Sequence, residues 1–411
     1  QGGGPGSLEF TSQYGTFTAG SLPRVDQQAS GANSQNQAAP HCAPQSYTQA
    51  SSSQQHAPAQ QSSTQTPRST PSGVEISDIT AAIESFVRVA DGTPWKDGYR
   101  RYRIRTVEGT DDFASVAEVL RRRFRPGKRD APPDLLVEVP HGADRREHYD
   151  ALHARMVGAL PEDLHEFFHA NTDMGAWDVG RRVAERIVAE DPGRSALLVR
   201  CLIPRTFVDT NRLVDAADEL GAGGLTGGIP SYVTHPEDRA LLEGLHRAYV
   251  ELAERAYEAV CGAGGFALMP HSYGPRTMGI AAVDADIVQA IRAAWAPDVW
   301  ATWPLRPEVD LITRRPDGER LAPASVVERV LAAYAEAGLE AVEATTYTLH
   351  PATQGARFAG RWPGQTLCVE VRRDLLVDEF DLLRALTPEP TRVERAAAPI
   401  AGAIQEWLRA R

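Results

Sequence analysis

Residues 135–142 read Leu-Leu-Val-Glu-Val-Pro-His-Gly, and residues 266–272 repeat the pattern as Phe-Ala-Leu-Met-Pro-His-Ser. In each stretch a short apolar run, typical of a buried strand, leads through proline to a histidine. Open α/β sheets place their functional sites at the carboxyl ends of their strands. We therefore expect His141 and His271 to lie at one edge of a central sheet, where two imidazoles could share a metal ion.

The chain from residue 131 onward alternates between strand-like and helix-like segments. Strands are expected at 134–139, 196–203, 265–269, 343–348 and 366–371, and helices at 175–190, 237–261, 284–294, 324–337 and 396–410. Alternation of this kind predicts one large α/β domain over residues 131–411 with a mostly parallel or mixed sheet.

Two segments precede this domain. Residues 1–72 are rich in Gln, Ser, Thr and Pro, and we expect a disordered tail because this composition buries too little apolar surface to fold. The tail starts without Met, and its first ten residues are typical of a cloning remnant. Residues 73–130 are expected to form a small α/β extension, with helices at 76–90 and 112–124 and a strand at 99–107. Neither segment matches a motif that we can place.

The composition argues against several classes of function. The 411-residue chain is 42% hydrophobic and carries a net charge of −11, which disfavours nucleic acid and anionic membranes as partners. We expect the basic run at 121–129 to be a solvated helix end. No apolar run approaches the roughly 20 residues of a membrane helix, and no signal peptide is legible. The four cysteines are scattered, as in reduced, cytoplasmic proteins, and we expect that location. The oligomeric state stays unknown.

The metal site needs a third ligand. Catalytic zinc commonly takes two histidines and one carboxylate and keeps a fourth position for water. Asp144 follows His141 by three residues, close to the His-x-x-Glu spacing of zinc carboxypeptidases. Asp173 lies in a polar turn before a helix, where it could instead be an N-cap. The residues alone leave both aspartates open.

A second group of polar residues, Arg205 and Asp209-Thr-Asn211-Arg212, follows the strand expected at 196–203. The planar fork of Arg212 fits a carboxylate, and Asn211 adds a further donor. Asp209 is expected to orient Arg212. Arg205 is a candidate to polarise a scissile carbonyl and stabilise the developing oxyanion. The alternative interpretation is a surface turn with an ion pair.

Glu370 lies inside the apolar strand expected at 366–371. A carboxylate in a buried strand must be paired, protonated or functional. We consider it a general base, which would take a proton from water and pass it to a leaving amine. The alternating pattern also allows this side chain to face solvent.

One further motif competes for the metal. His165-Glu166-Phe-Phe-His169 is a literal H-E-x-x-H, the helix motif of zinc metalloproteases. That motif needs a long buried helix, whereas Pro161 precedes it closely and a polar turn follows at 171–175. A zinc protease built on these residues is therefore kept only as an alternative.

The blocks quoted above, in their order, resemble the N-formylglutamate amidohydrolase family, relatives of the zinc carboxypeptidases and aspartoacylases. The resemblance covers roughly residues 135–376, and its blocks are Pro140-His141-Gly, Asn-Thr-Asp-Met-Gly-Ala at 171–176, Arg205 to Arg212, Leu-Thr-Gly-Gly-Ile-Pro at 225–230, Leu245-His246-Arg247, Pro270-His271-Ser272, the stretch 355–364 and Val369-Glu370-Val-Arg-Arg-Asp-Leu-Leu. It implies a zinc-carboxypeptidase-like, three-layer α/β fold with a mixed central sheet.

The resemblance also implies roles for individual residues. Zinc, one ion per chain, would be bound by His141, Asp173 and His271; Asn211, Arg212 and His246 would bind substrate; Arg205 and Glu370 would be catalytic. The implied reaction is hydrolysis of an amide bond in an N-acyl amino acid or at a carboxylate-bearing peptide end. The partner would then be a small molecule or a peptide end.

Two positions depart from the family. Met269 stands where the family has Asp, two residues before the second histidine, so support for the metal is weaker there. The late Gly-Gly of the family is replaced by Arg357-Phe-Ala-Gly-Arg361, which could reshape or recharge the pocket. Zinc-dependent hydrolysis is therefore favoured over formylglutamate itself as the substrate. A non-catalytic member that binds a carboxylate or peptide is the remaining alternative.

Overall fold

The computed structural model describes residues 132–214, 227–280 and 282–411 in full, and the backbone of five strands nearer the N-terminus. Two of these strands, β1 (Glu9–Ser12) and β2 (Gly15–Thr18), pair as an antiparallel hairpin. The helix expected at 76–90 and most of the tail expected at 1–72 lie outside the described residues.

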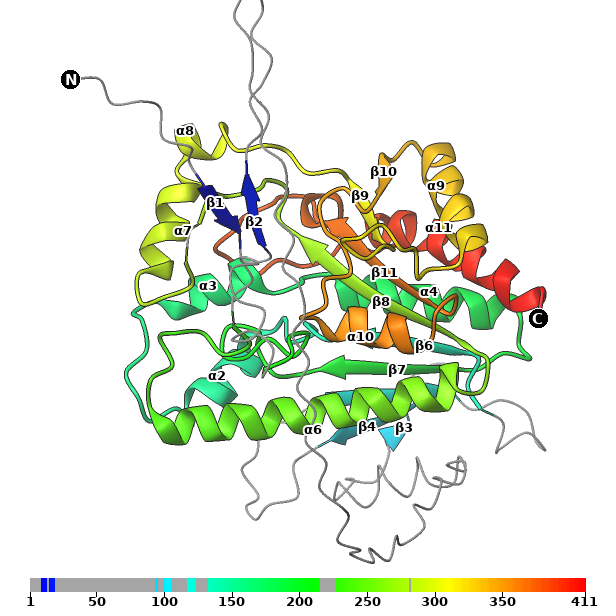
Figure 1. The fold of residues 1–411 in the computed structure, drawn as a ribbon, viewed down its shortest axis with the longest axis horizontal. Coiled ribbons are helices and arrows are strands. Elements are labelled where there is room, and N and C mark those ends of the chain that lie inside the picture. The colour runs from blue at the N-terminus through cyan, green and yellow to red at the C-terminus, as the bar shows by residue number, and fades with distance from the viewer. Residues whose placement is uncertain are drawn as a thin grey trace, which may run out of the picture. The chain divides into compact units, whose positions relative to one another are not determined.

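A nine-stranded mixed sheet in the order β10-β9-β11-β8-β6-β7-β5-β4-β3 forms the centre of the fold (Figure 1). Its strands are β3 (Thr93–Pro94), β4 (Tyr99–Ile104), β5 (Ala117–Arg122), β6 (Leu135–Val139), β7 (Ala196–Cys201), β8 (Phe266–Tyr273), β9 (Val309–Ile312), β10 (Ala341–Glu343) and β11 (Thr366–Arg372). Strands β7, β6, β8 and β11 are parallel, while β9 and β5 run antiparallel to their neighbours β11 and β7. The predicted mixed sheet is confirmed.

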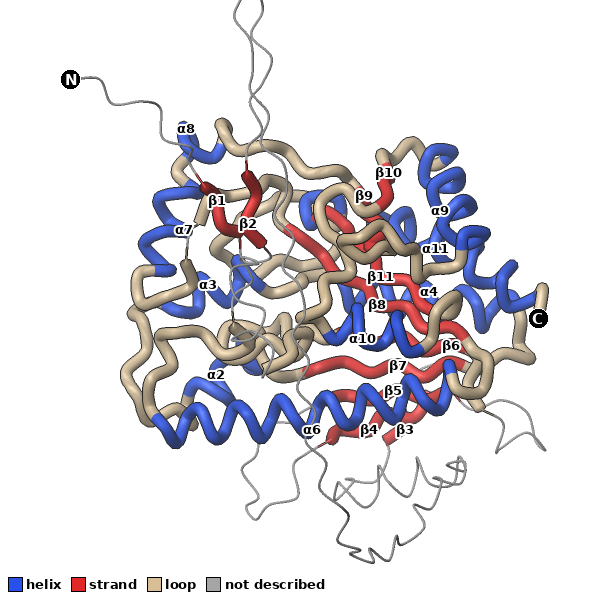
Figure 2. Tube along the Cα trace, viewed as in Figure 1, coloured by secondary structure: helices blue, strands red, loops and turns tan. Residues whose placement is uncertain are grey.

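Helices cover both faces of this sheet (Figure 2). They are α2 (Arg146–His153), α3 (Leu164–Asn171), α4 (Ala176–Glu190), α6 (Pro236–Cys261), α7 (Ile287–Trp295), α8 (Pro297–Trp300), α9 (Ala324–Glu336), α10 (Gln354–Arg361) and α11 (Pro390–Arg409), with a 3₁₀ turn at Arg373–Leu375. Val137 and Val369 face an apolar cluster built with α4, α9 and α11, whereas Leu136 and Cys368 face one built with α6 and α10. The fold is therefore a three-layer α/β arrangement, as the sequence predicts.

The inner strands are mostly apolar because helices cover them on both faces. Every residue of β6, β8 and β11 is buried. Each fully buried Val, Leu or Phe contributes about 1.5–3 kcal/mol relative to an exposed one. Burial of this kind fixes the register of the strands, since a slip by one residue would turn each side chain to the opposite face.

Two neighbouring strands separate where the candidate ligands lie. The ladder between β6 and β8 joins Leu135–Val137 to Phe266–Leu268, and the chain then leaves β6 at Pro140. Strand β8 continues to Tyr273 beside β11. The segment that follows β6 can therefore bring His141 over the later part of β8.

Most of the expected elements from residue 132 onward are confirmed, but one strand is wrong. Strand β10 ends at Glu343 rather than running through 343–348, and Ala344 has a φ of 51°. The reason is Asp310, whose carboxylate accepts hydrogen bonds from the backbone N–H groups of Thr345 and Thr346. These bonds divert the chain from the ladder into a loop.

The helix expected at 112–124 is also wrong, because Ala117–Arg122 is strand β5. It pairs antiparallel with both β4 and β7, and the edge of β7 offers backbone partners that a helix would leave unpaired. The basic run therefore begins in a strand and not at a helix end. Among the described helices, none combines the length and apolar character needed to cross a bilayer.

Candidate metal centre

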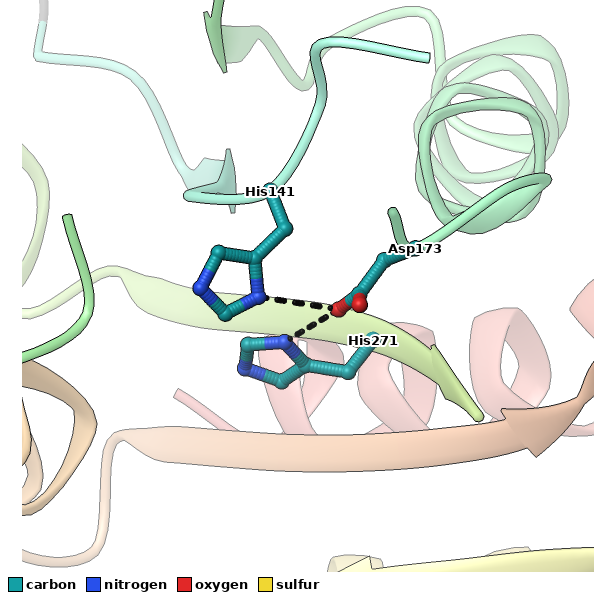
Figure 3. A group of neighbouring side chains, drawn as sticks. All are labelled: His141, Asp173 and His271. Atoms are coloured by element: carbon teal, nitrogen blue, oxygen red, sulfur yellow. Dashed lines mark hydrogen bonds and ion pairs between the residues drawn. The ribbon is translucent and has the colours of Figure 1, made fainter. Parts of the chain in front are cut away.

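Two histidines and an aspartate converge at the separation of β6 and β8 (Figure 3). The Nδ1 atom of His141 lies 3.1 Å from Oδ2 of Asp173, and Nδ1 of His271 lies 2.8 Å from the same oxygen. All three side chains are buried, and their potential ligand atoms lie within 4.8 Å of one another. The sequence prediction that these three residues come together is thus met by the geometry.

The local structure around Asp173 aims its carboxylate at the histidines. Asp173 lies in the turn between α3 and α4, and the N-cap of α4 is Gly175, with a φ of 82°. The alternative interpretation of Asp173 as the N-cap is therefore wrong. The hydroxyl of Thr172 donates to the carbonyl of Ala143 over 2.9 Å, which ties this turn to the segment that carries His141.

Asp144, the other candidate for the third ligand, lies outside the cluster. Its carboxylate accepts a hydrogen bond from the buried guanidinium of Arg200, which also donates to the carbonyl of Gly142 over 2.8 Å. This pair supports the loop after β6 and leaves Asp173 as the carboxylate of the cluster.

A second carboxylate, that of Asp209, contacts the other ring nitrogen of His141. Oδ1 of Asp209 lies 2.7 Å from Nε2 of His141, and Oδ2 lies 3.0 Å from Nη2 of Arg205. Arg212, which Asp209 was expected to orient, lies farther away, with its Nε 3.9 Å from Oδ2. Histidines that bind a metal through one nitrogen typically donate the other N–H to a carboxylate. Asp209 is in position for that role, which sequence reasoning missed because the two residues are 68 positions apart.

The charges of the cluster follow from this packing. Burial disfavours the charged imidazole of His141, but Asp209 and Asp173 outweigh it and raise its pKa to about 10. Burial opposes ionisation of Asp173, yet the two histidines hold the pKa of its carboxyl well below the usual range. Burial lowers the pKa of His271. A cation at this position would therefore find a carboxylate already ionised and would displace a proton from His141.

The arginines lie behind the cluster. Nη1 of Arg205 is 3.5 Å and Nη2 of Arg373 is 3.9 Å from Oδ1 of Asp173. Arg205 is thus held between Asp173 and Asp209, and it is absent from the described residues that line the adjacent cavity. Its expected contact with a scissile carbonyl stays a prediction.

A cavity of about 60 Å³ opens beside the cluster. The described residues that line it are His141, Asn211, Arg212, Met269, His271, Ile312, Tyr347, Thr348, Leu349, His350, Thr353, Gly355, Cys368 and Glu370. Asn211 and Arg212, the predicted carboxylate-binding pair, border the same space as both histidines. They are buried, so the alternative of an exposed surface turn is wrong.

Glu370 faces this cavity and not the solvent. It is 4% exposed and occupies the same rung of the β8–β11 ladder as His271. Its Oε2 atom has no hydrogen-bond partner among the described residues. Burial, reinforced by Asp173, raises the pKa of its carboxyl well above the usual range. A buried carboxyl of this kind is suited to accept and release a proton.

His246 supports the site from outside the cavity. Its Nε2 donates to the backbone carbonyl of Arg212 over 2.8 Å. Among the described cavity-lining residues His246 does not appear. This contact positions Arg212, whereas the expected contact of His246 with substrate stays a prediction.

The competing H-E-x-x-H motif does not assemble a comparable group. The rings of His165 and His169 lie 6.5 Å apart on α3, which has eight residues. Glu166, the base that the motif requires, forms an ion pair with Arg292 over 2.6 Å. In the part of the chain that the structure describes, the group suited to a metal is the His141 cluster.

Comparison with known proteins gives two separate results. The family model described as the UvrC RNAse H endonuclease domain matches residues 68–138. UvrABC system protein C of Streptococcus thermophilus (strain ATCC BAA-491 / LMD-9) is 48% identical over 60 residues, which are 14% of this chain and 10% of that protein. The chain thus spans about a tenth of such relatives. The match covers the segment 73–130, which the sequence analysis could not place, and it ends before His141.

Solved structures align with the larger part of the chain. N-formylglutamate amidohydrolase from Ralstonia eutropha JMP134 is 16% identical, with 72% of this chain and 99% of that chain covered and a TM-score of 0.43. A metallo-carboxypeptidase from Burkholderia cenocepacia is 12% identical, with 81% and 67% covered and a TM-score of 0.32. Both proteins are hydrolases by name. Since both TM-scores are below 0.5, the function proposed below rests on the geometry of the site.

Proposed function

We propose that the chain is a zinc-dependent hydrolase that cleaves the amide bond of an N-acyl amino acid or of a carboxylate-bearing peptide end. The observation that carries this proposal is the buried His141–Asp173–His271 cluster. It borders a cavity that is also lined by Asn211 and Arg212, the candidate anion-binding pair, and by the buried carboxyl of Glu370. The sequence resemblance to N-formylglutamate amidohydrolases supports the same reaction.

The donor set of the cluster fits zinc. Two imidazoles and one carboxylate are a common ligand set of catalytic zinc, which keeps a further position open. The ligand atoms of a tetrahedral zinc ion, each about 2.0–2.1 Å from the metal, lie roughly 3.3 Å apart. The distances of 2.8 and 3.1 Å around Oδ2 of Asp173 need only a small expansion to reach that value. His141, Asp173 and His271 would hold one ion per chain.

When bound, zinc would supply a Lewis acid that polarises the carbonyl and acidifies water. The side chains of the chain supply the rest. Asn211 and Arg212 bind the substrate carboxylate and so fix the position of the amide bond. Glu370 accepts a proton from the attacking water and returns it to the leaving nitrogen. Asp209 keeps the His141 ring in the orientation seen in Figure 3.

The test is the metal content of the purified protein after zinc loading, for wild type, His141→Ala and His165→Ala. We expect one zinc per chain in wild type and His165→Ala, and loss of zinc in His141→Ala. Loss in His165→Ala alone would support the protease motif. Zinc-loaded protein is then assayed with N-formyl and N-acetyl amino acids. Zinc and carboxylate binding without turnover would indicate a non-catalytic binding protein, and absence of zinc from all three would refute the proposal.

The remaining expectations are part of the same proposal. The partner is a small molecule or peptide end, and the net charge of −11 disfavours nucleic acid and anionic membranes. A cytoplasmic location accords with the scattered cysteines, of which Cys201, Cys261 and Cys368 are free and buried.

A further inference from the structure

The cavity beside the candidate metal centre has two unlike walls. One wall carries the histidines, the anion-binding pair and Glu370. The other is formed by Met269, Ile312, Leu349 and Cys368, none of which is more than 8% exposed. A substrate bound in this cavity would therefore contact an apolar surface as well as the polar residues.

The two sulfur atoms of the apolar wall lie close to the residue that would bind the substrate carboxylate. Sγ of Cys368 is 3.9 Å from Sδ of Met269. Gly355 separates them from Asn211, since a Cβ atom on Gly355 would lie 3.3 Å from the Met269 sulfur and 3.7 Å from Oδ1 of Asn211. A substrate held through its carboxylate by Asn211 would thus place the adjoining side chain beside Met269 and Cys368.

The orientation of the Asn211 amide fits this arrangement. Its Oδ1 accepts a hydrogen bond of 3.0 Å from the backbone N–H of Gly355. The Nδ2 group is therefore the end that can donate to a carboxylate. Gly355 therefore lies between the amide of Asn211 and the two sulfur atoms of the apolar wall.

The described lining of the cavity holds few cationic side chains that a second carboxylate could contact directly. Among the described residues that line it, Arg212 carries the one guanidinium. His350 is also there, but burial and the neighbouring Arg212 lower the pKa of its imidazole.

The two arginines of α10, which the sequence suggested could recharge the pocket, point to a different partner. Nη2 of Arg357 lies 2.8 Å and Nη1 of Arg361 lies 3.0 Å from Oε1 of Glu254 on α6, and Arg361 also pairs with Glu258. Both arginine side chains are more than 40% exposed. They join two helices at the surface and leave the charge of the cavity unchanged.

We propose that the substrates are N-acyl amino acids with a single carboxylate and an apolar side chain, which packs against Met269 and Cys368. This inference rests on the proposed function and defines its substrate class. A second carboxylate, as in N-formylglutamate, would be desolvated beside the thioether, and Arg212, the guanidinium among the described lining residues, would already be paired with the first carboxylate. Met269 and Cys368 are then residues that determine specificity.

The test compares three substrates on the zinc-loaded full chain: the N-formyl derivatives of methionine, glutamine and glutamate. Glutamine matches glutamate in shape and lacks its charge, and methionine matches it in length and is apolar. We expect kcat/KM to fall in the order methionine, glutamine, glutamate, with on the order of 100-fold between the first and last. A preference for N-formylglutamate would overturn the inference.

Two variants place a cation in the cavity lining, one within the apolar wall at Leu349 and one at the neighbouring Thr348. Thr348→Arg and Leu349→Arg should each reduce the methionine-to-glutamate ratio by about tenfold or more, because the new charge offsets the second carboxylate. Thr348 is only partly buried, so this variant remains informative if the buried Leu349 position does not tolerate arginine. The matched control is Leu305→Arg, at a side chain that is 58% exposed, and it should keep the wild-type ratio. An unchanged ratio in folded Thr348→Arg would contradict the inference.

A binding measurement separates this inference from the proposed reaction. Calorimetry with the zinc-loaded protein measures the affinities of the free amino acids methionine, glutamine and glutamate. If no N-acyl amino acid is hydrolysed, the hydrolase proposal fails, but tighter binding of methionine than of glutamate still supports the apolar subsite. Equal or tighter binding of glutamate, or no binding of any of the three, would overturn it.

Discussion

At the scale of single residues, the side chain that links the two halves of the site is Asp209. It accepts from Nε2 of His141 and pairs with Arg205. Loss of a carboxylate that orients a ligand histidine typically weakens metal affinity about 10- to 100-fold. We expect Asp209→Asn to weaken zinc binding by about this factor, measured by competition with a chelator. Asp298→Asn, at an exposed position, is the control and should bind zinc as wild type does.

The buried carboxyl of Glu370 leads us to expect that kcat/KM depends on pH. Its pKa is raised by burial and by Asp173, and a general base acts only when ionised. The kcat/KM of wild type should therefore rise with pH through that elevated pKa. Glu370→Gln should lower kcat on the order of 100-fold or more and keep its zinc. A variant that retains both the activity and the rising limb of the profile would exclude Glu370 as the base.

The buried carboxyl of Glu138 leads us to expect that the free energy of unfolding depends on pH. It is 1% exposed, Tyr249 donates a hydrogen bond to it, and burial raises its pKa to about 7. An acid whose pKa is raised by folding stabilises the fold fully below its unfolded value, near 4.5, and loses that contribution as pH rises through 7. We expect Glu138→Gln, which mimics the neutral form, to be more stable than wild type at pH 8 by about 3 kcal/mol.

Urea denaturation at pH 5 and pH 8 checks this prediction. The two proteins should have similar free energies of unfolding at pH 5 and differ at pH 8. The same difference at both pH values would show that ionisation of Glu138 is not the cause.

At the scale of elements, helix α4 is held close to the sheet by a glycine. A Cβ atom on Gly180 would lie 2.6 Å from Cγ1 of Val137 and 2.9 Å from Cγ of Pro270. Gly180→Ala should therefore destabilise the protein by about 2 kcal/mol despite the better helix propensity of alanine. Gly244→Ala in α6, where no atom lies within 4 Å of the added Cβ, should stabilise it by about 0.5–1 kcal/mol. Opposite signs in urea denaturation support this packing, and two stabilising changes would contradict it.

The element scale also shows what the sequence could and could not predict. Long apolar runs such as those of β6 and β11 and the periodic stretch that forms α6 were predicted to within a few residues. Strand β9 was missed because it spans only Val309–Ile312. The loop after β10 was missed because it depends on Asp310, which comes from the neighbouring strand and leaves no local pattern.

The candidate site also contains contacts that the sequence predicted and contacts that it did not. His141, Asp173 and His271 were predicted to lie together, because the motifs that carry them follow one another at recognisable positions. The contact of Asp209 with His141 and the pairing of Arg357 with Glu254 were not predicted. Both are contacts across more than 60 residues, and only the packed structure determines them.

At the scale of the whole molecule, strand β5 covers the edge of β7, the last of the parallel strands. It pairs antiparallel with β7, a strand in which every residue is buried. A chain that begins at residue 132 would expose the backbone of β7, and exposed apolar edges promote association. We expect such a chain to bind zinc as the full chain does but to self-associate, measured by sedimentation velocity over a range of concentrations. A truncated chain with the same association state as the full chain would contradict this prediction.

The shared rung of Glu370 and His271 has a consequence for how this molecule can change over evolutionary time. One residue inserted into or lost from β8 or β11 would carry one member of the pair to the opposite face, while backbone pairing could still re-form. Such a descendant would lose its chemistry in a single event. Insertions and deletions in these two strands are therefore not tolerated if activity is to be kept. New specificity has to arise through substitution along the cavity wall or through altered loops.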